Sequence, residues 1–408
     1  MTKMTPMVAI FLTIASLNQA CFASRVEERL MNTILKDYNK RARPVEKETD
    51  VVHIVLDIAL PQVMKVDEKD EVIATNVWIR QYWTDFRLSW NKTEYDGISQ
   101  LILNPDKAWL PDVMLINSAK PLTGDRGAAA RLVVKHDGNV SWLNPMIFTS
   151  SCEIDITYFP LDDQSCRLTF SSWSYSDEFL DVHPASDTAD ISTYVENGEW
   201  ILLGVRSQRN VMTYDCCEGK FPDVTYHLEL RRRTLFYLMN FILPCVLIAV
   251  LTLLVFLLPP ESGERMSFGV TVLLSFTILL LMLMAKLPAT SKVIPLIAIY
   301  YACTIIEVSG AMGMGVSYAA ILSPGQLLGS NPGMDQAKLR ENRGKEHTNM
   351  TILTDNIFKQ EEADTMREEW RMAAIILNRL FAWIYSLTIV ITLMAVLLKA
   401  PRFRNGEL

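Results

Sequence analysis

Apolar and polar residues follow two different patterns along the chain, and the change comes at Arg233. Before it, short segments alternate between apolar and polar residues with the period of two that a half-buried β-strand requires. These segments are VVHIVLDIAL, EVIATNVWIRQYWTDFRLSW, RLVVKHDGNVSW, SCEIDITYF, CRLTFSSWSY and VTYHLELRRR. Asp-Gly, Asn-Pro and Pro-Asp turns interrupt them, so this part of the chain predicts a β-sandwich. In the second segment the alternation continues from Tyr82 to Trp90.

Residues 1–23 combine a lysine near the start, an apolar run and small residues before Ser24. This pattern is typical of a secretory signal peptide, which is too short to span a membrane and remain there; a buried helix is the alternative. We therefore expect the mature chain to begin near Ser24, without Cys21. Its first segment predicts an amphipathic helix at the start of an exported domain, residues 24–233, with apolar residues at helical spacing: Val26, Leu30, Ile34 and Leu35.

Long uncharged stretches follow Arg233, and each supplies the roughly 20 apolar residues that cross a bilayer. They are Thr234–Pro260, Met266–Ala285, Val293–Leu322 interrupted by Glu307, and Leu380–Leu398. The fold class predicted is therefore an extracellular β-sandwich with an N-terminal helix, followed by an all-α bundle of four transmembrane helices. The first three helices lie within residues 234–322 and the fourth within 372–400, and both termini are outside the cell.

Residues 323–371 open with SPGQLLGSNPG and end with the charged, helix-forming run KQEEADTMREEWR. This topology places them inside the cell, as a loop with an amphipathic helix. Asn349-Met350-Thr351 is then not expected to be glycosylated, whereas Asn91 and Asn139 begin sequons on the exported side and are predicted acceptors.

The composition excludes several classes of protein. A net charge of −7 argues against nucleic-acid binding. The 5 histidines are scattered and no nucleophile–base motif is present, so we expect neither an enzyme nor a cofactor or metal site. An adhesion or signalling receptor with a β-sandwich exterior is a further class, but it would need only one membrane span.

The cysteines of the exported domain are Cys152, Cys166, Cys216 and Cys217, which allow three pairings. A bond from Cys152 to Cys166 closes a comfortable loop around residues 153–165, worth a few kcal/mol. That leaves Cys216 with Cys217. Neighbouring Cα atoms are about 3.8 Å apart, closer than an ordinary disulfide prefers, so this bond closes no loop and needs a reason other than stability.

The second apolar stretch has the pattern of a pore lining. One helical face carries, in steps of three and four, Glu264, Ser267, Thr271, Leu274, Ile278, Leu281 and Ala285. In a ring of copies, the Glu264 carboxylates would concentrate cations and repel anions, the hydroxyls would solvate the ion, and Leu274 and Ile278 would form an apolar gate. The alternative is that the hydroxyls bond only to their own helix.

Two ionisable residues of these stretches have open roles. Lys286 directly follows the row, at the end where a second ring of acidic residues would favour cations. The permeability of the pore to calcium is therefore left open. Glu307 lies inside the third stretch, and an ionisable group at membrane depth is a functional candidate. It either modulates gating, faces a wet cavity between helices, or is protonated and hydrogen-bonded.

Several motifs together resemble those of pentameric Cys-loop ligand-gated channels over the whole mature chain. CEIDITYFPLDDQSC resembles the signature loop, with Phe159-Pro160 inside it. Two further segments resemble the first two spans of nicotinic acetylcholine receptor subunits: RRRTLFYLMNFILPCVLIAVLTLLVFLLP and SGERMSFGVTVLLS. The adjacent Cys216 and Cys217 are similar to the mark of an α-type subunit. The resemblance implies that this disulfide stiffens a hairpin over the agonist; the alternative, a metal or redox pair, has only His227 nearby.

The resemblance also implies an agonist site between subunits, lined by aromatic side chains that hold a quaternary or protonated amine. On the principal face, FSSWSY supplies Trp173, and Tyr214 and Phe221 flank the cysteine pair. On the complementary face, NVWIRQYW supplies Trp78, and VSWLNP supplies Leu143. Ile116, in PDVMLINSAK, stands where the family usually has a tyrosine, and Phe221 replaces another.

Both departures remove a hydroxyl and disfavour acetylcholine itself. Arg80 lies two residues from Trp78 on the same strand face, where a guanidinium could receive a carboxylate; a solvated Arg80 is the alternative. We therefore expect betaine or choline to be the agonist, and the sequence resembles the divergent nematode branch that contains choline- and betaine-gated receptors.

By the same resemblance, coupling to the pore involves Glu68 in VDEKDE, Phe159, Pro160 and Arg232, with an ion pair between Glu68 and Arg232. The expected partners are the lipid bilayer, monovalent cations, and identical or related subunits in a pentamer. The expected location is the plasma membrane, postsynaptic or neuromuscular. An accessory subunit of a heteromeric channel is the nearest alternative, favoured by Ile116.

Overall fold

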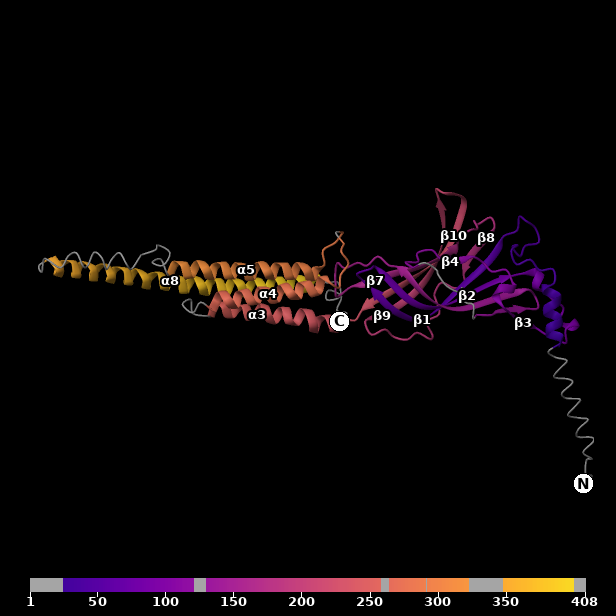
Figure 1. Ribbon diagram of the computed structural model, residues 1–408, viewed down its shortest axis with the longest axis horizontal. Helices are drawn as coiled ribbons and strands as arrows, with labels where there is room; N and C mark the ends of the chain where they lie inside the picture. The colour runs from indigo at the N-terminus through magenta and orange to yellow at the C-terminus, as the bar shows by residue number, and fades with distance from the viewer. Residues whose placement is uncertain (1–24, 121–129, 258–263, 291, 323–347, 400–408) are drawn as a thin grey trace, which may run out of the picture. The chain divides into compact units, whose positions relative to one another are not determined.

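The computed structural model describes residues 25–120, 130–257, 264–290, 292–322 and 348–399 (Figure 1). They form two compact units. The first holds the chain up to Asp155 together with Asp163–Arg233, and the second holds Ile156–Asp162 together with the chain from Thr234 onward. The expected signal peptide with Cys21, and the first part of the expected intracellular loop, lie outside the described residues.

The first unit contains two β-sheets. The six-stranded sheet has the order β3-β5-β6-β2-β1-β8, and the four-stranded sheet has the order β4-β7-β10-β9 (Figure 1). The strands are β1 Val52–Asp67, β2 Val72–Thr84, β3 Gln100–Leu103, β4 Val113–Leu115, β5 Leu132–Lys135, β6 Asn139–Ser151, β7 Asp163–Ser172, β8 Leu180–Pro184, β9 Trp200–Tyr214 and β10 Cys217–Arg232. All neighbouring strands pair antiparallel except β1 and β8, which run parallel.

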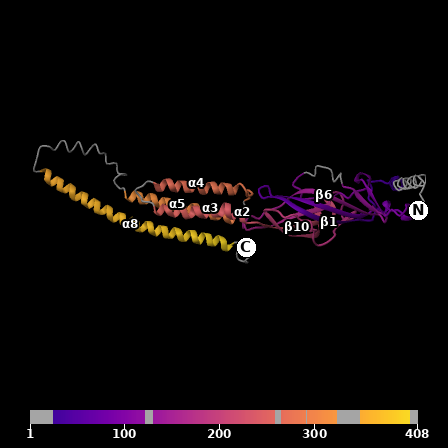
Figure 2. The same ribbon diagram turned by 90° about the horizontal axis from the view of Figure 1, so that it is seen from below.

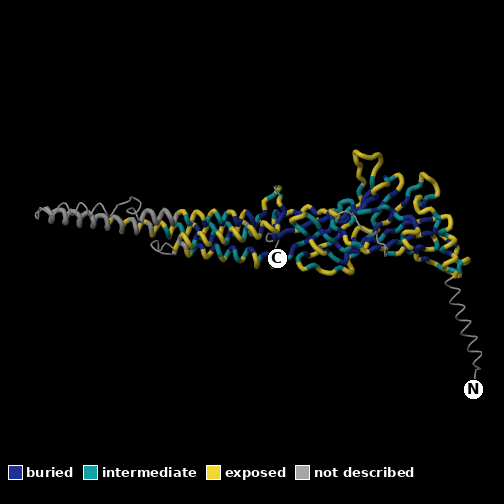
Figure 3. The backbone as a smooth tube through the Cα atoms, in the orientation of Figure 1, coloured by how far each residue is buried: buried dark blue, intermediate teal, exposed yellow. Residues whose placement is uncertain are grey.

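The core of this unit lies between the sheets, where alternate residues of the strands are buried (Figure 3). The rings of Phe148 on β6 and Phe170 on β7 lie edge to face, with centroids 5.4 Å apart. The hydroxyl of Tyr226 on β10 donates to the carbonyl of Leu56 on β1, 3.1 Å away, so a buried hydrogen bond also joins the sheets. The period-two pattern thus predicted the β-sandwich correctly.

Two segments predicted as strand are not strand. β2 ends at Thr84, and Phe86–Leu88 form a 3₁₀ helix. The buried Asp85 caps it: its carboxylate accepts from the backbone N–H of Arg87 at 3.0 Å and from the hydroxyl of Tyr38 at 2.6 Å. A side chain that satisfies the backbone locally competes with the strand ladder.

The segment SCEIDITYF is a loop after Ser151. The amide side chain of Gln164 bonds to both backbone groups of Asp155, accepting from its N–H at 2.9 Å and donating to its carbonyl at 2.8 Å. These bonds replace those that a neighbouring strand would make, so alternation alone misassigned the segment.

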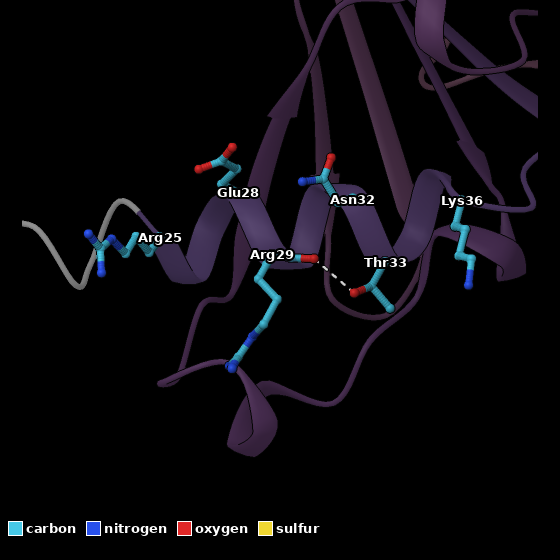
Figure 4. A pocket seen from close by; sticks show the side chains of 6 residues that line it. All are labelled: Arg25, Glu28, Arg29, Asn32, Thr33 and Lys36. Carbon is cyan, nitrogen blue, oxygen red and sulfur yellow. Dashed lines mark hydrogen bonds between the residues drawn. The ribbon is translucent and has the colours of Figure 1, made fainter.

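Residues 25–35 are helical, and Leu30 on this helix is fully buried. The hydroxyl of Thr33 donates to the carbonyl of Arg29 at 2.8 Å (Figure 4). A polar surface hollow borders the helix, lined by Arg25, Glu28, Arg29, Asn32, Thr33 and Lys36. None of the predicted site residues is among them.

The second unit is helical. Its elements are α2 Leu235–Tyr237, the π-helical turn η4 Leu238–Ile242, α3 Leu243–Leu257, α4 Glu264–Met284, α5 Leu296–Leu322 and α8 Thr348–Lys399 (Figure 2). Within the described residues, three helical stretches are long and apolar enough to cross a membrane: Leu235–Leu254, Met266–Met284 and Ile375–Ala395. A shorter apolar stretch, Leu296–Gly310, lies in α5.

The π turn ends at Ile242, two residues before Pro244. Proline has no N–H, and its ring clashes with the carbonyl four residues earlier, so a regular α-helix is disfavoured there. The hydroxyl of Tyr301 on α5 donates to the carbonyl of Phe241 within the turn, 3.0 Å away. A neighbouring helix thus satisfies a backbone group in an apolar environment.

α8 is one helix of 52 residues, so the charged run and the fourth apolar stretch are continuous. No glycine or proline occurs between Thr348 and Lys399 to interrupt it. The side-chain amide of Asn378 donates to the carbonyl of Phe256 on α3 at 2.6 Å, and the rings of Phe256 and Tyr385 lie 5.7 Å apart. These contacts pack α8 against α3.

Candidate functional site

The hairpin of β9 and β10 carries the cysteine pair at its tip. Cys216 and Cys217 are disulfide-bonded, and residues 211–220 are all exposed (Figure 3). Tyr214 on one strand and Phe221 on the other have ring centroids 5.7 Å apart, tilted by 62°. The hairpin therefore presents the exposed ring of Tyr214 and the half-buried ring of Phe221 close to the disulfide.

Trp173 follows the last residue of β7 and is 68% exposed, which is unusual for a side chain of this size. Asp112 holds its backbone: one carboxylate oxygen accepts from the hydroxyl of Ser172 at 2.5 Å, and the other from the N–H of Ser174 at 2.8 Å. Hydrogen bonds to Asp112 thus hold the residues on both sides of Trp173, whose indole remains exposed. Sequence reasoning missed this role of Asp112.

The Trp173 segment and the hairpin lie against each other. The N–H of Asp177 donates to the carbonyl of Lys220 at 2.7 Å. Gly219 has φ +98°, and a Cβ atom there would be 2.8 Å from the Cβ of Ser176. The structure therefore places the segment after β7, which carries Trp173, against the β9–β10 hairpin, which carries Tyr214 and Phe221. Ile116 lies on the same sheet, just after β4, where its N–H donates to the carbonyl of Thr169 at 2.8 Å.

The predicted complementary residues form one patch on the six-stranded sheet. Trp78 and Arg80 project from the same face of β2, and Trp78 is 41% exposed. Arg80 is directly opposite Leu143 on β6, and Trp78 is directly opposite Pro145. Cross-strand register therefore places Trp78, Arg80 and Leu143 side by side.

Arg80 makes two ion pairs. Its guanidinium lies 3.0 Å from a carboxylate oxygen of Asp57, its cross-strand neighbour on β1, and 2.6 Å from one of Asp190. The hydroxyl of Ser192 together with Arg80 holds the pKa of Asp190 below its ordinary range, because both stabilise the charged carboxylate. Arg80 is thus held by two carboxylates and is not available as an uncompensated cation.

Arg232 is fully buried and lies in an ion-pair group. Its guanidinium is 2.5 Å from a carboxylate oxygen of Glu68 and 3.2 Å from one of Glu199, and it stacks 4.2 Å above the ring of Trp200. The expected pair of Glu68 and Arg232 is therefore present. Glu199 and Trp200 are additional partners that the sequence did not indicate.

The loop between Cys152 and Cys166 is closed by their disulfide. Its middle, Ile156–Asp162, belongs to the helical unit. Phe159 is buried there against Tyr237 at the end of α2, with ring centroids 5.0 Å apart, and the carbonyl of Thr157 accepts from the N–H of Leu296 on α5 at 3.0 Å. Pro160 follows within the same buried segment.

The predicted pore row is exposed in the single chain: Glu264, Ser267, Thr271, Leu274, Ile278 and Leu281 on α4, and Ala285 directly after its end. The opposite face is buried, and Phe276 meets Tyr301 of α5 with ring centroids 6.4 Å apart. The hydroxyl of Thr271 donates to the carbonyl of Ser267 at 2.8 Å, the helix-internal bond considered as the alternative. This bond uses the donor only and leaves the oxygen lone pairs facing outward.

Four further predicted residues have defined surroundings. Glu307 accepts a hydrogen bond from the hydroxyl of Thr392 on α8 at 3.1 Å, so it faces a neighbouring helix. Lys286, just beyond α4, is exposed. Asn91 and Asn139, the two predicted glycosylation sites, are exposed as well.

Two family models match the chain. The neurotransmitter-gated ion-channel ligand binding domain matches residues 27–234, and the neurotransmitter-gated ion-channel transmembrane region matches residues 241–322. The matches cover the sandwich and the helices α3 to α5.

Curated proteins are also similar. The neuronal acetylcholine receptor subunit alpha-3 of Homo sapiens is 39% identical over 308 residues, which cover 75% of this chain and 60% of that protein. The human alpha-9 subunit is 39% identical over 289 residues, covering 71% and 60%. The human alpha-2 subunit is 40% identical over 289 residues, covering 70% and 54%. The chain thus spans less than two thirds of the length of these relatives.

Proposed function

The chain belongs to the neurotransmitter-gated ion-channel family, and from this premise we propose that it is a subunit of a pentameric, cation-selective channel opened by a small quaternary-ammonium agonist. Members of this family are ligand-gated channels rather than enzymes. The observation that carries the proposal is the aromatic group around the hairpin, in which Trp173 and Tyr214 are exposed and Phe221 is half-buried beside Tyr214.

Aromatic faces attract a cation that has no hydrogen to donate, and each such contact contributes about 0.5–2 kcal/mol. Trp173 is the main partner in this proposal, because its indole is the most exposed of the three and its backbone is fixed by Asp112. The disulfide of Cys216 and Cys217 stiffens the hairpin that closes over the agonist.

The second half of the agonist site comes from a neighbouring subunit. Trp78, Arg80 and Leu143 are on the six-stranded sheet, whereas the hairpin and Trp173 belong to the four-stranded sheet. A head-to-tail ring lets the first patch of one copy meet the second patch of the next. Because this chain has both patches, we propose that it forms a homopentamer or pairs with related subunits.

The ion pairs of Arg80 bear on which of the two agonists expected from the sequence should bind more tightly. One guanidinium faces two carboxylates, Asp57 and Asp190, so the group carries no surplus positive charge for the acid of betaine. Choline has the quaternary ammonium without the acid. We therefore place choline first and betaine second, in keeping with the nematode branch that the sequence resembles, and acetylcholine third because of Ile116 and Phe221.

The proposed ion path is the exposed row of α4, with the Glu264 ring selecting cations and Leu274 and Ile278 forming the gate. α5 is proposed as a further membrane span, so that four helices cross the plasma membrane and the sandwich is extracellular. A postsynaptic or neuromuscular location and the glycosylation of Asn91 and Asn139 are part of the same proposal. Glu68, Arg232, Phe159 and Pro160 are the proposed coupling residues.

The test is current recorded from oocytes that express this chain alone, with choline, betaine and acetylcholine applied in turn. We expect inward sodium current, largest and most sensitive for choline. Replacing Trp173 by Ala should lower the potency of choline about tenfold, the equivalent of roughly 1.4 kcal/mol. Glu264→Lys should shift the reversal potential toward that of chloride.

An accessory role is the second candidate, favoured by Ile116 in place of a tyrosine. It predicts no current from the chain alone although the protein reaches the cell surface, and a current when a second α-type subunit is added. Current from the chain alone would exclude this role.

A further inference from the structure

A group of metal-ligating side chains lies on the six-stranded sheet, apart from the residues assigned to the agonist. His53 is on β1, and Asp181 and His183 are on β8 (both strands are labelled in Figure 1). One possible ligand atom from each residue lies within 4.8 Å of the other two. No predicted function uses them.

The backbone holds these three side chains on one face of a parallel pair of strands. His53 is directly opposite Asp181, and His183 follows Asp181 by two residues, so all three project to the same side. The residues between them, Ile54 and Val182, are fully buried in the core. The apolar alternation therefore fixes the direction of the histidines, because a slip by one residue would expose the core.

The contacts within the group already resemble those of a metal site. Nε2 of His183 lies 2.8 Å from one carboxylate oxygen of Asp181, and the rings of His53 and His183 have centroids 5.9 Å apart. In the metal-free protein, Nε2–H donates to the carboxylate. A metal ion would take the place of that proton, and the neutral ring would carry its hydrogen on Nδ1.

Arg209 positions the carboxylate. Its guanidinium lies 2.7 Å from the second carboxylate oxygen of Asp181 and also donates to the carbonyl of Val182 at 3.1 Å. The oxygen that faces His183 is thus presented in a fixed orientation, as the ligands of metal sites usually are. The positive charge of Arg209 also competes with a cation for the same carboxylate.

We propose that His53, Asp181 and His183 bind a zinc ion on the outer face of the β1–β8 pair. Two imidazoles and one carboxylate are a common zinc ligand set, with a fourth position left to water. Calcium and magnesium prefer oxygen ligands and are disfavoured by the two nitrogens. All three ligand atoms lie within 4.8 Å of one another, and the exposed His53 side chain has room to adjust to a tetrahedral arrangement.

The site could not be inferred from the sequence, because its ligands lack the short spacing of a zinc motif. His53 and Asp181 meet only because β1 and β8 pair in parallel at the edge of the sheet. The sequence had predicted no metal site for this reason.

The test is zinc binding to the purified full-length protein in detergent, measured by titration calorimetry, with cobalt absorption as a second probe of nitrogen ligands. We expect one zinc per chain. His53→Ala and His183→Ala should each raise the dissociation constant at least about tenfold, the size of effect found when a metal site loses a supporting group. His136→Ala, a histidine outside the group, should leave it unchanged.

Two further variants sharpen the result. His53→Gln retains a polar side chain of similar size, so its loss of zinc would not reflect misfolding. His183→Gln is the matching change at the second histidine and should likewise lose zinc. The proposal is overturned if the wild-type protein binds no zinc, or if His53→Ala and His183→Ala bind it as tightly as the wild type. Because the measurement needs no channel opening, its outcome is independent of the agonist.

Discussion

Gly219 of the β9–β10 hairpin lies so close to Ser176 that a Cβ atom on the glycine would be 2.8 Å from the Cβ of the serine. The glycine also has φ +98°, a conformation that other residues rarely adopt. The pair joins the cysteine-bearing hairpin to the segment that carries Trp173. The distance between these two aromatic elements therefore depends on the absence of a side chain at residue 219.

Gly219→Ala should weaken the agonist response. The added methyl group must push the hairpin away from Ser176, and a strained φ costs on the order of 1–3 kcal/mol. We expect the half-maximal agonist concentration to rise about tenfold or more, which corresponds to roughly 1.4 kcal/mol. Dose–response curves in oocytes measure it. Gly204→Ala, on β9 with open space around its Cβ position, is the control. An equal effect of the two variants would contradict the prediction.

Arg232→Gln should destabilise the protein strongly. Arg232 is fully buried between Glu68 and Glu199, and removing one partner of a buried ion pair typically costs about 3–5 kcal/mol. Arg233→Gln is the matched control, because Arg233 pairs with the exposed Glu196 and such surface pairs contribute about 0–1 kcal/mol. Unfolding temperature and surface abundance are the measurements. Similar values for the two variants would show that burial of the pair has no energetic consequence.

Cysteines introduced along α4 should report the pore row. Ser267→Cys, Thr271→Cys and Leu274→Cys place a thiol on the exposed face, whereas Phe276→Cys places it against Tyr301. A charged thiol reagent applied with agonist should block current through the first three variants and leave the fourth unchanged. Block of Phe276→Cys at the same rate would mean that this face, rather than the predicted row, contacts the ion path.

Asp190→Asn should reduce stability at neutral pH only. The pKa of Asp190 is lowered in the folded protein by Ser192 and Arg80, so the ionised carboxylate is stabilised by folding. This contribution is fully present above the ordinary aspartate pKa of about 3.9 and is lost progressively as the pH falls from there through the lowered pKa of the folded protein. We expect the unfolding temperatures of wild type and variant to differ at pH 7, and the difference to begin to shrink below about pH 4 and to decrease steadily in stronger acid.

Asp187→Asn, at an exposed position three residues earlier, is the control for this titration and should match the wild type throughout. A difference between wild type and Asp190→Asn that persists unchanged into acid would contradict the prediction, because the protonated carboxyl no longer makes a charged pair with Arg80. High salt should also reduce the difference at pH 7, since the pair is partly exposed.

Local patterns in the sequence determined the sandwich, the apolar helices, the exposed row of α4 and the loop closed by Cys152 and Cys166. Each of these depends on residues close together in the chain: alternation, a 3.6-residue period, or a short cysteine spacing. The same reasoning failed at Phe86–Leu88, where the buried Asp85 caps a 3₁₀ helix. It also failed after Ser151, where Gln164 takes up the backbone hydrogen bonds of Asp155.

Only the tertiary structure decided which distant residues meet. Arg80 was identified in the sequence, but its partner Asp190 lies 110 residues away and is brought near by folding. Asp112 beneath Trp173, Ser176 against Gly219, and His183 beside His53 are likewise joined by strand pairing and loop packing. A periodic pattern specifies which face of a strand is buried, whereas charge pairs and metal ligands depend on the register between strands, which is set by the packing of the whole core.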